Sequence, residues 1–279
     1  MNLKFTKMHG CGNDYIYIDC FKQEVSDPNA LSIKLSDRHF SIGGDGIVLI
    51  CPSNQADVKM RMFNIDGSEG NMCGNAIRCV GKYAYERLGI KKDAITVDTK
   101  SGIKYLRLTV KDDKVISVTV DMGKAITEPE RIPVNLDGHM IIDRPVQIGE
   151  ETYRITCVSM GNPHCVVFTD SVETLDLQKK GPVFEKNVLF PEQVNTEFIR
   201  VIDKNHIQMR VWERGSGETL ACGTGACAAV TACVLNGFVP ADEAVEVQLI
   251  GGTLSITYTK DTVFMTGPAE VAFDGEVEI

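Results

Sequence analysis

The chain repeats its own pattern at a separation of 149 residues, and this repeat limits its possible folds more than any other feature. Gly12-Asn13 returns as Gly161-Asn162, and Cys73-Gly74 returns as Cys222-Gly223. A run of β-branched or aromatic residues follows each Gly-Asn pair. Several landmarks in one register are typical of two halves built from the same supersecondary pattern. The sequence therefore predicts two similar domains.

The hydrophobic spacing predicts the same order of elements in each half. Residues 57–64 alternate between apolar and polar types, as a half-buried strand does. Apolar residues then recur at helical spacing from 74 to 88, and Gly89 is a typical helix end. Strands are expected over 94–122, with a hairpin turn at Asp112-Asp113. The second half is expected to repeat this order, with a strand over 206–213, one principal helix over 223–236 and strands over 244–267.

Composition narrows the classes of partner. The 279 residues carry a net charge of −9, which argues against a nucleic acid or an anionic membrane as partner. No apolar run approaches the roughly 18 residues that a membrane span needs. The charged start of the chain is not followed by the apolar core of a secretory signal. We expect a cytoplasmic protein that acts on a small molecule.

The ten cysteines do not form a recognisable metal motif. The chain contains no Cys-x-x-Cys pair and no His-x-x-x-His pair, so the sequence predicts no metal site. Most of the cysteines are expected to be small buried apolar residues. Cys73 and Cys222 differ from the others because they match in the repeat, and each follows a Gly-rich loop and opens a predicted helix.

A helix start suits both an acid–base thiol and a bound carboxylate. Its first backbone N–H groups lack intrahelical partners, and the helix dipole places partial positive charge there. We therefore expect the pKa of both thiols to fall below the usual value of about 8.5. The same N–H groups form an anion site for a substrate carboxylate, and Gly74 and Gly223 allow close approach.

These features predict a cofactor-independent amino-acid epimerase. If both helix starts face one cleft, Cys73 and Cys222 flank the α-carbon of a bound amino acid. One thiolate then removes the α-proton while the opposite thiol supplies a new one, which inverts the centre without pyridoxal phosphate or metal. A protein of another class, a thiol redox sensor with a reversible Cys73–Cys222 disulfide, remains an alternative.

Longer motifs around these residues resemble the diaminopimelate epimerase family and cover nearly the whole chain in the family's order. The resemblance implies interconversion of LL- and meso-2,6-diaminopimelate by two-base 1,1-proton transfer, for lysine and peptidoglycan precursor synthesis. The motifs are Met8-His9-Gly10-Cys11-Gly12-Asn13-Asp14, Phe63-Asn64-Ile65-Asp66-Gly67-Ser68-Glu69 with Met72-Cys73-Gly74-Asn75, Met160-Gly161-Asn162-Pro163-His164, and Glu213-Arg214-Gly215-Ser216-Gly217-Glu218-Thr219 with Ala221-Cys222-Gly223-Thr224-Gly225.

The resemblance also implies the architecture. The family's fold is α/β (α+β), with two pseudo-symmetric domains that are each a mixed β-sheet curled around a central helix. The active site lies in the cleft between them. On this chain the N-terminal half would comprise 1–122 plus 268–279, and the C-terminal half 123–267. Family members are commonly homodimers, so a homodimer is expected.

The family's functional positions carry over residue by residue. Cys73 and Cys222 match the catalytic thiols, and His164 and Glu213 match the pair that tunes their pKa values and orients them. Arg214 suits a bidentate grip on a distal carboxylate. The substrate-binding positions are Asn13, Asn64, Gly74, Asn75, Asn162, Asn195, Glu213, Arg214, Gly223 and Thr224.

Two positions depart from the family pattern. Many relatives carry a glutamine where this chain has Gly46, although its counterpart Asn195 keeps an amide. Phe273 stands where some relatives have a tyrosine at the dimer contact.

Proline or hydroxyproline racemase-like enzymes of the same superfamily are the nearest alternative, but Asn75 and Glu213-Arg214 favour diaminopimelate. Isomerases of unsaturated acids on the same fold are a further possibility.

Overall fold

The computed structural model describes residues 2–279, which form two compact units. Unit 1 comprises the chain up to Asp121 together with Thr266–Ile279, and unit 2 comprises Met122–Met265. The sequence predicts boundaries one or two residues later, at 122 and 267. The chain therefore leaves unit 1 once and returns to it for its last segment.

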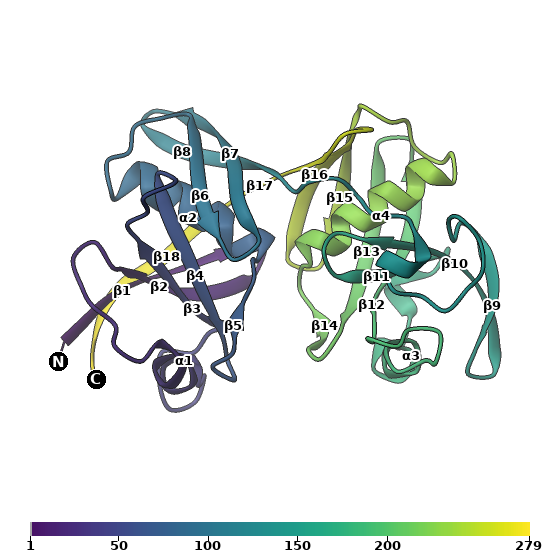
Figure 1. The fold of residues 1–279 in the computed structure, drawn as a ribbon, viewed down its shortest axis with the longest axis horizontal. Coiled ribbons are helices and arrows are strands. Elements are labelled where there is room, and N and C mark those ends of the chain that lie inside the picture. Colours follow the sequence, from purple (N-terminus) through teal and green to yellow (C-terminus); the bar gives the residue numbers. More distant parts are fainter. Residues whose placement is uncertain (1) are drawn as a thin grey trace. The chain divides into compact units, whose positions relative to one another are not determined.

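Unit 1 contains two helices and a mixed set of strands. Its elements are β1 (Asn2–Gly10), β2 (Asn13–Asp19), α1 (Pro28–Ser36), β3 (Gly46–Cys51), β4 (Val58–Asn64), β5 (Glu69–Gly70), α2 (Gly74–Glu86), β6 (Ala94–Thr99), β7 (Gly102–Lys111), β8 (Lys114–Asp121) and β18 (Glu270–Glu278). The last strand, β18, runs antiparallel beside β1, with Asn2 opposite Glu278. Figure 1 shows this pair as a yellow strand beside a purple one.

Unit 2 repeats the same succession. Its elements are η1 (Pro129–Arg131), β9 (Arg144–Ile148), β10 (Glu151–Ser159), β11 (Pro163–Phe168), η2 (Val172–Thr174), α3 (Leu177–Glu185), β12 (Asn195–Asp203), β13 (His206–Glu213), β14 (Gly217–Thr219), α4 (Gly223–Leu235), β15 (Ala244–Leu249), β16 (Gly252–Tyr258) and the first residues of β17 (Val263–Gly267). The strands and the helix predicted around each cysteine are confirmed, within about two residues at their ends.

The repeat extends to the pairing register. In unit 1, β2 and β3 are parallel with Ile16 opposite Ile47, and in unit 2, β11 and β12 are parallel with Cys165 opposite Thr196. Both residues of the second pair stand 149 positions after those of the first. Antiparallel pairs β3–β4 and β12–β13 follow, and then parallel pairs β4–β6 and β13–β15. Each unit is therefore a mixed sheet of the same topology.

The sequence missed one short helix in each half. Helices α1 and α3 occupy matching positions, and each begins after an aspartate whose side chain accepts a backbone N–H, Asp27 in α1 and Asp176 in α3. An aspartate at this position satisfies an N–H that has no intrahelical acceptor. Pro182 lies inside α3 and normally argues against a helix, which hides the element from pattern reading.

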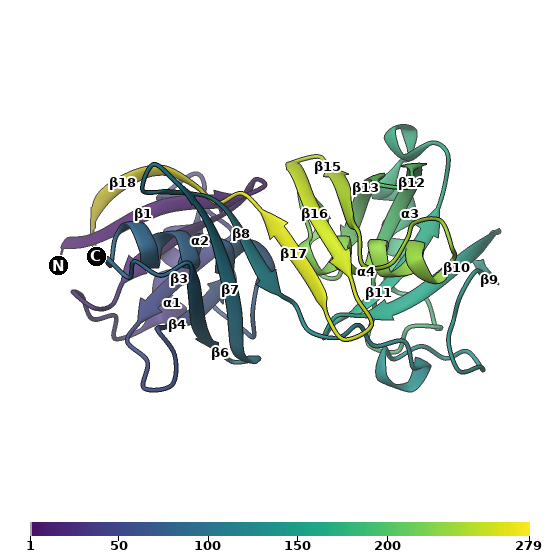
Figure 2. The same cartoon turned by 90° about the horizontal axis from the view of Figure 1, so that it is seen from above.

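The two central helices are enclosed by their own strands (Figures 1 and 2). Helix α2 packs on β1 and β8, and α4 packs on β10 and β16. Helix α4 is rich in alanine, glycine and cysteine, and Gly225–Cys233 are all buried. A helix that is apolar on all sides belongs in a core. Neither helix exceeds 13 residues, and no helix within residues 2–279 is long and apolar enough to span a membrane.

The backbone conformation and surroundings of Gly46 exclude any residue with a side chain. Its φ is +149°, and a Cβ built there would lie 2.0 Å from the carbonyl oxygen of Phe63. Such a contact requires the backbone to move. The counterpart Asn195, by contrast, bears a buried side chain.

We therefore predict that Gly46→Ala destabilises the chain by about 2–5 kcal/mol, from backbone strain and overpacking together. Gly89 is the matched control, because its φ is +73° but no atom lies within 4 Å of a Cβ built there. Gly89→Ala should cost only about 1 kcal/mol. Urea unfolding measures both, and equal losses would contradict the steric argument.

Candidate active site

Cys73 caps the start of α2 in unit 1. Its backbone is extended (φ −128°, ψ 122°), and its sulfur accepts a hydrogen bond from the backbone N–H of Ala76 at 3.5 Å. The thiol also lies 3.4 Å from Oδ1 of Asn13, to which it donates. The sulfur is half-buried. Cys73 and Asn13, which the sequence places far apart, are therefore in direct contact.

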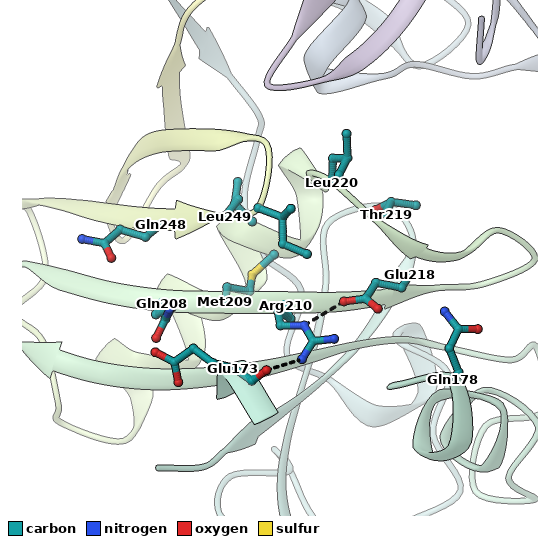
Figure 3. A pocket seen from close by; sticks show the side chains of 11 residues that line it. Glu173, Gln178, Gln208, Met209, Arg210, Glu218, Thr219, Leu220, Gln248 and Leu249 are labelled. Carbon is teal, nitrogen blue, oxygen red and sulfur yellow. Dashed lines mark hydrogen bonds and ion pairs between the residues drawn. The ribbon is translucent and has the colours of Figure 1, made fainter. Parts of the chain in front are cut away.

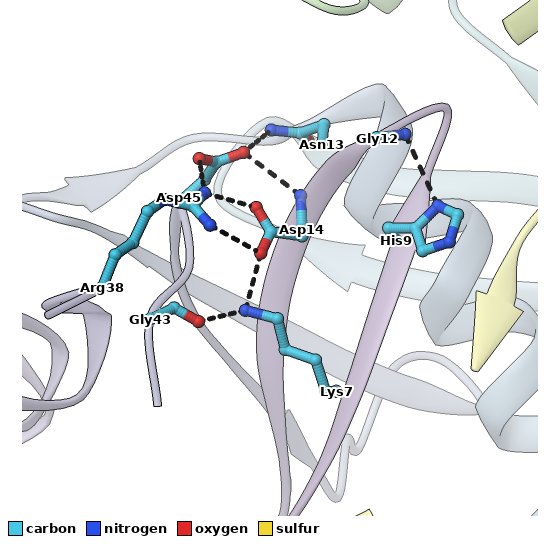
Figure 4. Close-up of polar contacts among 8 residues, drawn as sticks. All are labelled: Lys7, His9, Gly12, Asn13, Asp14, Arg38, Gly43 and Asp45. Carbon is cyan, nitrogen blue, oxygen red and sulfur yellow. Dashed lines mark hydrogen bonds and ion pairs between the residues drawn. The ribbon is translucent and has the colours of Figure 1, made fainter. Parts of the chain in front are cut away.

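A charged network holds Asn13 in this orientation (Figure 4). Nδ2 of Asn13 donates to Asp45 at 2.7 Å, which leaves Oδ1 to face the sulfur. Arg38 bridges Asp45 at 2.9 Å and Asp14 at 2.6 Å, and Lys7 pairs with Asp14 at 2.7 Å. Sequence reasoning missed these four charged residues.

The ionic state of Asp14 follows from the same network. Burial opposes ionisation of its carboxyl, but hydrogen bonds and charges from Arg38 and Lys7 outweigh burial and hold its pKa below the usual value. The carboxylate is therefore a stable partner for both cations. The network as a whole fixes the loop that carries Asn13.

The other candidates of unit 1 also lie around α2 or at the end of β4. Gly74 and Asn75 are buried in the first turn of α2. The carbonyl of Gly74 accepts a hydrogen bond from the fully buried Arg78 at 3.0 Å, and Arg78 also donates to the carbonyl of Pro268 at 3.1 Å. Asn64 is half-buried and donates to Ser68 at 3.0 Å. Arg78 thus ties the returning C-terminal segment to the start of α2.

Cys222 caps the start of α4 in unit 2 with the same geometry. Its sulfur accepts the backbone N–H of Gly225 at 3.3 Å and lies 3.5 Å from the hydroxyl of Thr224. Gly223 is buried in the first turn of the helix. Only 5% of Cys222 is exposed. Both candidate thiols are therefore N-caps of the two central helices, as predicted.

The prediction of a lowered thiol pKa is wrong for Cys222. Burial raises its pKa well above the usual value, and the negative charges of Glu213 and Glu197 raise it further. The hydrogen bonds from Thr224 and from the Gly225 N–H act in the opposite direction but do not compensate. The helix start does favour the thiolate, but it is outweighed by the surroundings. These surroundings favour the protonated form of Cys222.

Glu213 and Arg214 stand at the end of β13 and differ in exposure. Burial raises the pKa of Glu213, although its hydrogen bonds with Thr219 and Cys222 oppose the rise. Arg214 is exposed, and its guanidinium donates to the carbonyl of Glu192 at 2.8 Å. A side chain held only by an exposed carbonyl is available to a ligand.

Asn195 has a different environment from the other candidates. Its Nδ2 donates to the carbonyl of Pro163 at 2.8 Å, and its Oδ1 accepts the backbone N–H of Arg214 at 3.0 Å. The side chain is 4% exposed. The two ends of the amide therefore hold the backbone of Pro163 and of Arg214 in place.

His164 lies fully buried on β11 between two partners. Its Nδ1 is 2.7 Å from Oε1 of Glu197, which is also fully buried, and its Nε2 is 3.1 Å from Oδ1 of Asn162. Nδ2 of Asn162 lies 3.3 Å from the hydroxyl of Thr224. Sequence reasoning missed Glu197, although a glutamate inside the apolar strand β12 is itself an unusual feature that could have drawn attention to it.

A pocket of about 690 Å³ in unit 2 is lined by residues of β13, β14 and β15, and Cys222 is not among them (Figure 3). It includes Thr219, and an ion pair joins Arg210 to Glu218 at 2.7 Å. The counterpart pair of unit 1, Arg61 and Glu69, has the same separation of 2.7 Å. A pair repeated in both halves is part of the common scaffold.

None of the ten cysteines forms a disulfide in the part of the chain that the structure describes. Within residues 2–279, no group of three or more histidine, cysteine, aspartate or glutamate side chains is arranged to hold a metal ion.

Solved structures of low sequence identity share the fold. A hydroxyproline epimerase from Agrobacterium vitis has a TM-score of 0.71 at 14% identity, covering 99% of this chain and 92% of its own. A phenazine biosynthesis protein from Bacillus anthracis also has a TM-score of 0.71, at 18% identity and with 100% of both chains covered. These matches confirm the predicted fold class.

Sequence comparison is more specific. The model of the family described as diaminopimelate epimerase matches residues 5–128 and 156–272. A diaminopimelate epimerase of Acetivibrio thermocellus is 54% identical over 279 residues, covering 99% of each chain. One from Methanococcus maripaludis is 52% identical, covering 99% of this chain and 100% of its own. With this identity along its full length, the chain belongs to the diaminopimelate epimerase family.

Proposed function

We propose that this chain interconverts LL- and meso-2,6-diaminopimelate and that Cys73 and Cys222 are its two acid–base groups. The observation that carries the proposal is the pair of cysteine N-caps at matching positions of the two units. The relatives named diaminopimelate epimerase support the choice of substrate. Each unit, close to the predicted halves 1–122 with 268–279 and 123–267, would supply one thiol.

The helix starts would bind the reacting end of the substrate. Gly74 and Asn75 begin α2, and Gly223 and Thr224 begin α4, where backbone N–H groups and the helix dipole favour an anion. Held there, the α-carboxylate places the α-carbon beside the sulfurs. Negative charge that develops on the carboxylate during proton removal is met by donors that are already oriented.

The proton transfer then needs only the two sulfurs. A thiolate takes the α-proton, and the C–H electron pair remains as a carbanion delocalised into the carboxylate. The opposite thiol gives its proton to the other face of the α-carbon and becomes the thiolate. Because the raised pKa of Cys222 keeps it protonated, we assign Cys222 as the first acid and Cys73 as the first base. The roles reverse for the other isomer.

The remaining candidates would bind the amino groups and the distal end. Arg214 suits the distal carboxylate, because its guanidinium is exposed and is held only by a carbonyl. Amide side chains donate and accept without adding charge, which suits a substrate with two ammonium and two carboxylate groups. The proposed set is Asn13, Asn64, Asn162, Asn195, Glu213 and Arg214, with His164 and Glu213 orienting and tuning the thiols.

The two-base mechanism predicts the fate of solvent hydrogen. With LL-diaminopimelate in heavy water, the inverted product should carry deuterium at the α-carbon, because the new proton comes from a thiol that has exchanged with solvent. Mass spectrometry combined with chiral chromatography measures both. Inverted product without deuterium would rule out the mechanism.

Single substitutions test the pair itself. Cys73→Ala and Cys222→Ala should each reduce epimerisation by at least the 10²–10⁴-fold, in order of magnitude, that one general acid or base contributes. Cys227→Ala, which alters a buried cysteine of α4 that does not cap the helix, is the matched control and should remain active. Substantial activity in either cap variant would refute the assignment of Cys73 and Cys222 as the acid–base pair. Turnover of free proline instead of diaminopimelate would favour the proline racemase-like alternative.

The effect of Glu213 on Cys222 predicts a pH shift with a definite sign. Glu213 raises the pKa of Cys222 through its negative charge, so Glu213→Gln should lower that pKa. Alkylation of Cys222 by iodoacetamide, followed by mass spectrometry of its peptide, should then reach half-maximal rate at a lower pH. Glu218→Gln is the matched control because Glu218 is paired with Arg210. An unchanged profile in Glu213→Gln, or an equal shift in the control, would contradict the assignment.

We further propose a cytoplasmic homodimer. Ten cysteines without a disulfide among the described residues suit a reducing compartment. Phe273, at the position of the family's dimer contact, is 49% exposed on β18. Light scattering coupled to gel filtration should give twice the chain mass of 30.6 kDa. A mass of one chain at micromolar concentration would contradict the dimer.

A further inference from the structure

We propose that Glu197 is a positioning residue that keeps His164 doubly protonated and so directs a hydrogen-bond chain toward the sulfur of Cys222. The inference rests on the proposed function and extends it to a residue outside the family's functional set. Glu197 does not reach the substrate-binding positions directly but acts through His164.

The burial of Glu197 requires a compensating cation. Both Glu197 and His164 are 0% exposed, and Oε2 of the carboxylate accepts no hydrogen bond from the described residues. A buried carboxylate is strongly disfavoured unless a positive group pairs with it. The imidazole at 2.7 Å from Oε1 is the ion-pair partner that the described part of the chain gives it.

The contacts of the ring point to the imidazolium. Nδ1 faces a carboxylate oxygen and Nε2 faces the amide oxygen of Asn162, and both of these oxygens accept hydrogen bonds. A neutral imidazole donates from only one nitrogen, whereas the imidazolium donates from both. The two acceptors are therefore satisfied together only when the ring carries two protons.

The protonated ring sets the direction of the bonds that lead to the thiol. Because Oδ1 of Asn162 accepts from Nε2, Nδ2 of Asn162 donates to the hydroxyl of Thr224 at 3.3 Å. That hydroxyl is then free to donate its proton to Cys222 at 3.5 Å. If Nε2 were an acceptor, the amide would turn, and the hydroxyl would donate to the amide oxygen instead.

The position of the carboxylate connects it with the same helix start. A Cβ built at Gly225 would lie 2.7 Å from Oε1 of Glu197, and the N–H of Gly225 donates to the sulfur of Cys222. The other titratable groups that face the pair are Cys165 on β11, Glu213 on β13 and Cys222 itself. The negative charge of Glu197 raises the pKa of Cys222, and the imidazolium beside the carboxylate reduces this effect.

Only unit 2 contains this arrangement. Tyr15 and Val48 stand at the positions of unit 1 that correspond to His164 and Glu197, so no ion pair forms there. In unit 1, Asn13 contacts the sulfur directly and is oriented by Asp45. The sulfur of Cys73 thus contacts a single oriented amide, whereas the sulfur of Cys222 lies at the end of a longer hydrogen-bond chain.

Nitrogen-15 NMR of the histidine rings tests the protonation state without reference to activity. In the unmodified chain near neutral pH, both ring nitrogens of His164 should carry protons, with the signals assigned by their absence in His164→Asn. In Glu197→Gln one nitrogen should lose its proton, since a neutral amide does not offset a buried imidazolium. A singly protonated ring in the unmodified chain would overturn the proposal even if the variant failed to fold.

Kinetics then separate positioning from a general structural role. Glu197→Gln should lower kcat roughly 10- to 100-fold, the size expected for losing a hydrogen bond to an ionised group, with little change in KM. Glu185→Gln is the matched control, because Glu185 is another buried carboxylate of unit 2 and bonds the indole of Trp212 at 2.7 Å. It should leave both ring protons of His164 in place.

The outcomes of these experiments are distinct. Loss of the ring proton in the control as well, or retention of both protons in Glu197→Gln, would overturn the proposal. Failure of the proposed function would appear differently, as absence of epimerisation by the unmodified chain with the ring still doubly protonated.

Discussion

Each central helix has a cysteine at its N-cap, where a side chain with an oxygen acceptor would stabilise the helix more. Serine, threonine, aspartate and asparagine are the preferred N-caps, and a weaker cap costs the helix about 1 kcal/mol. Cys73 and Cys222 nevertheless occupy this position and accept the N–H of Ala76 and Gly225. The position makes chemical sense because it places a thiol where an anion is also stabilised.

The common scaffold fixes where the thiols lie, and unlike neighbours decide how each behaves. The pairing register of the two units agrees at a separation of 149 residues, and so do the capping contacts. The side chains around the sulfurs do not agree. Burial and, to a lesser degree, carboxylates of β12 and β13 raise the pKa of Cys222, whereas Cys73 contacts an amide held by a charged network. The proposed reaction, which needs one thiol and one thiolate at the same time, would benefit from this difference.

Much of the fold was predictable because its information is local. Periodicity along the chain gave the helices after Cys73 and Cys222 and the strands that follow them. Helix α3 was missed because Pro182 is locally unfavourable there and is tolerated only in the packed structure. The pKa of Cys222 was mispredicted for a related reason. The helix start is a local property, but burial, Glu197 and Glu213 come from strands that only folding brings together. Ligand contacts of the Asn set remain predictions.

The path of the chain has a consequence for the order in which the halves form during synthesis. Unit 2 is a single continuous segment, whereas unit 1 lacks β18 until the last residues have been made. The buried Arg78 of unit 1 cannot form its hydrogen bond to the carbonyl of Pro268 until that residue has been synthesised. Although nascent chains usually fold from the N-terminus, here the half that leaves the ribosome first is completed last. Unit 1 therefore lacks β18 throughout the synthesis of unit 2.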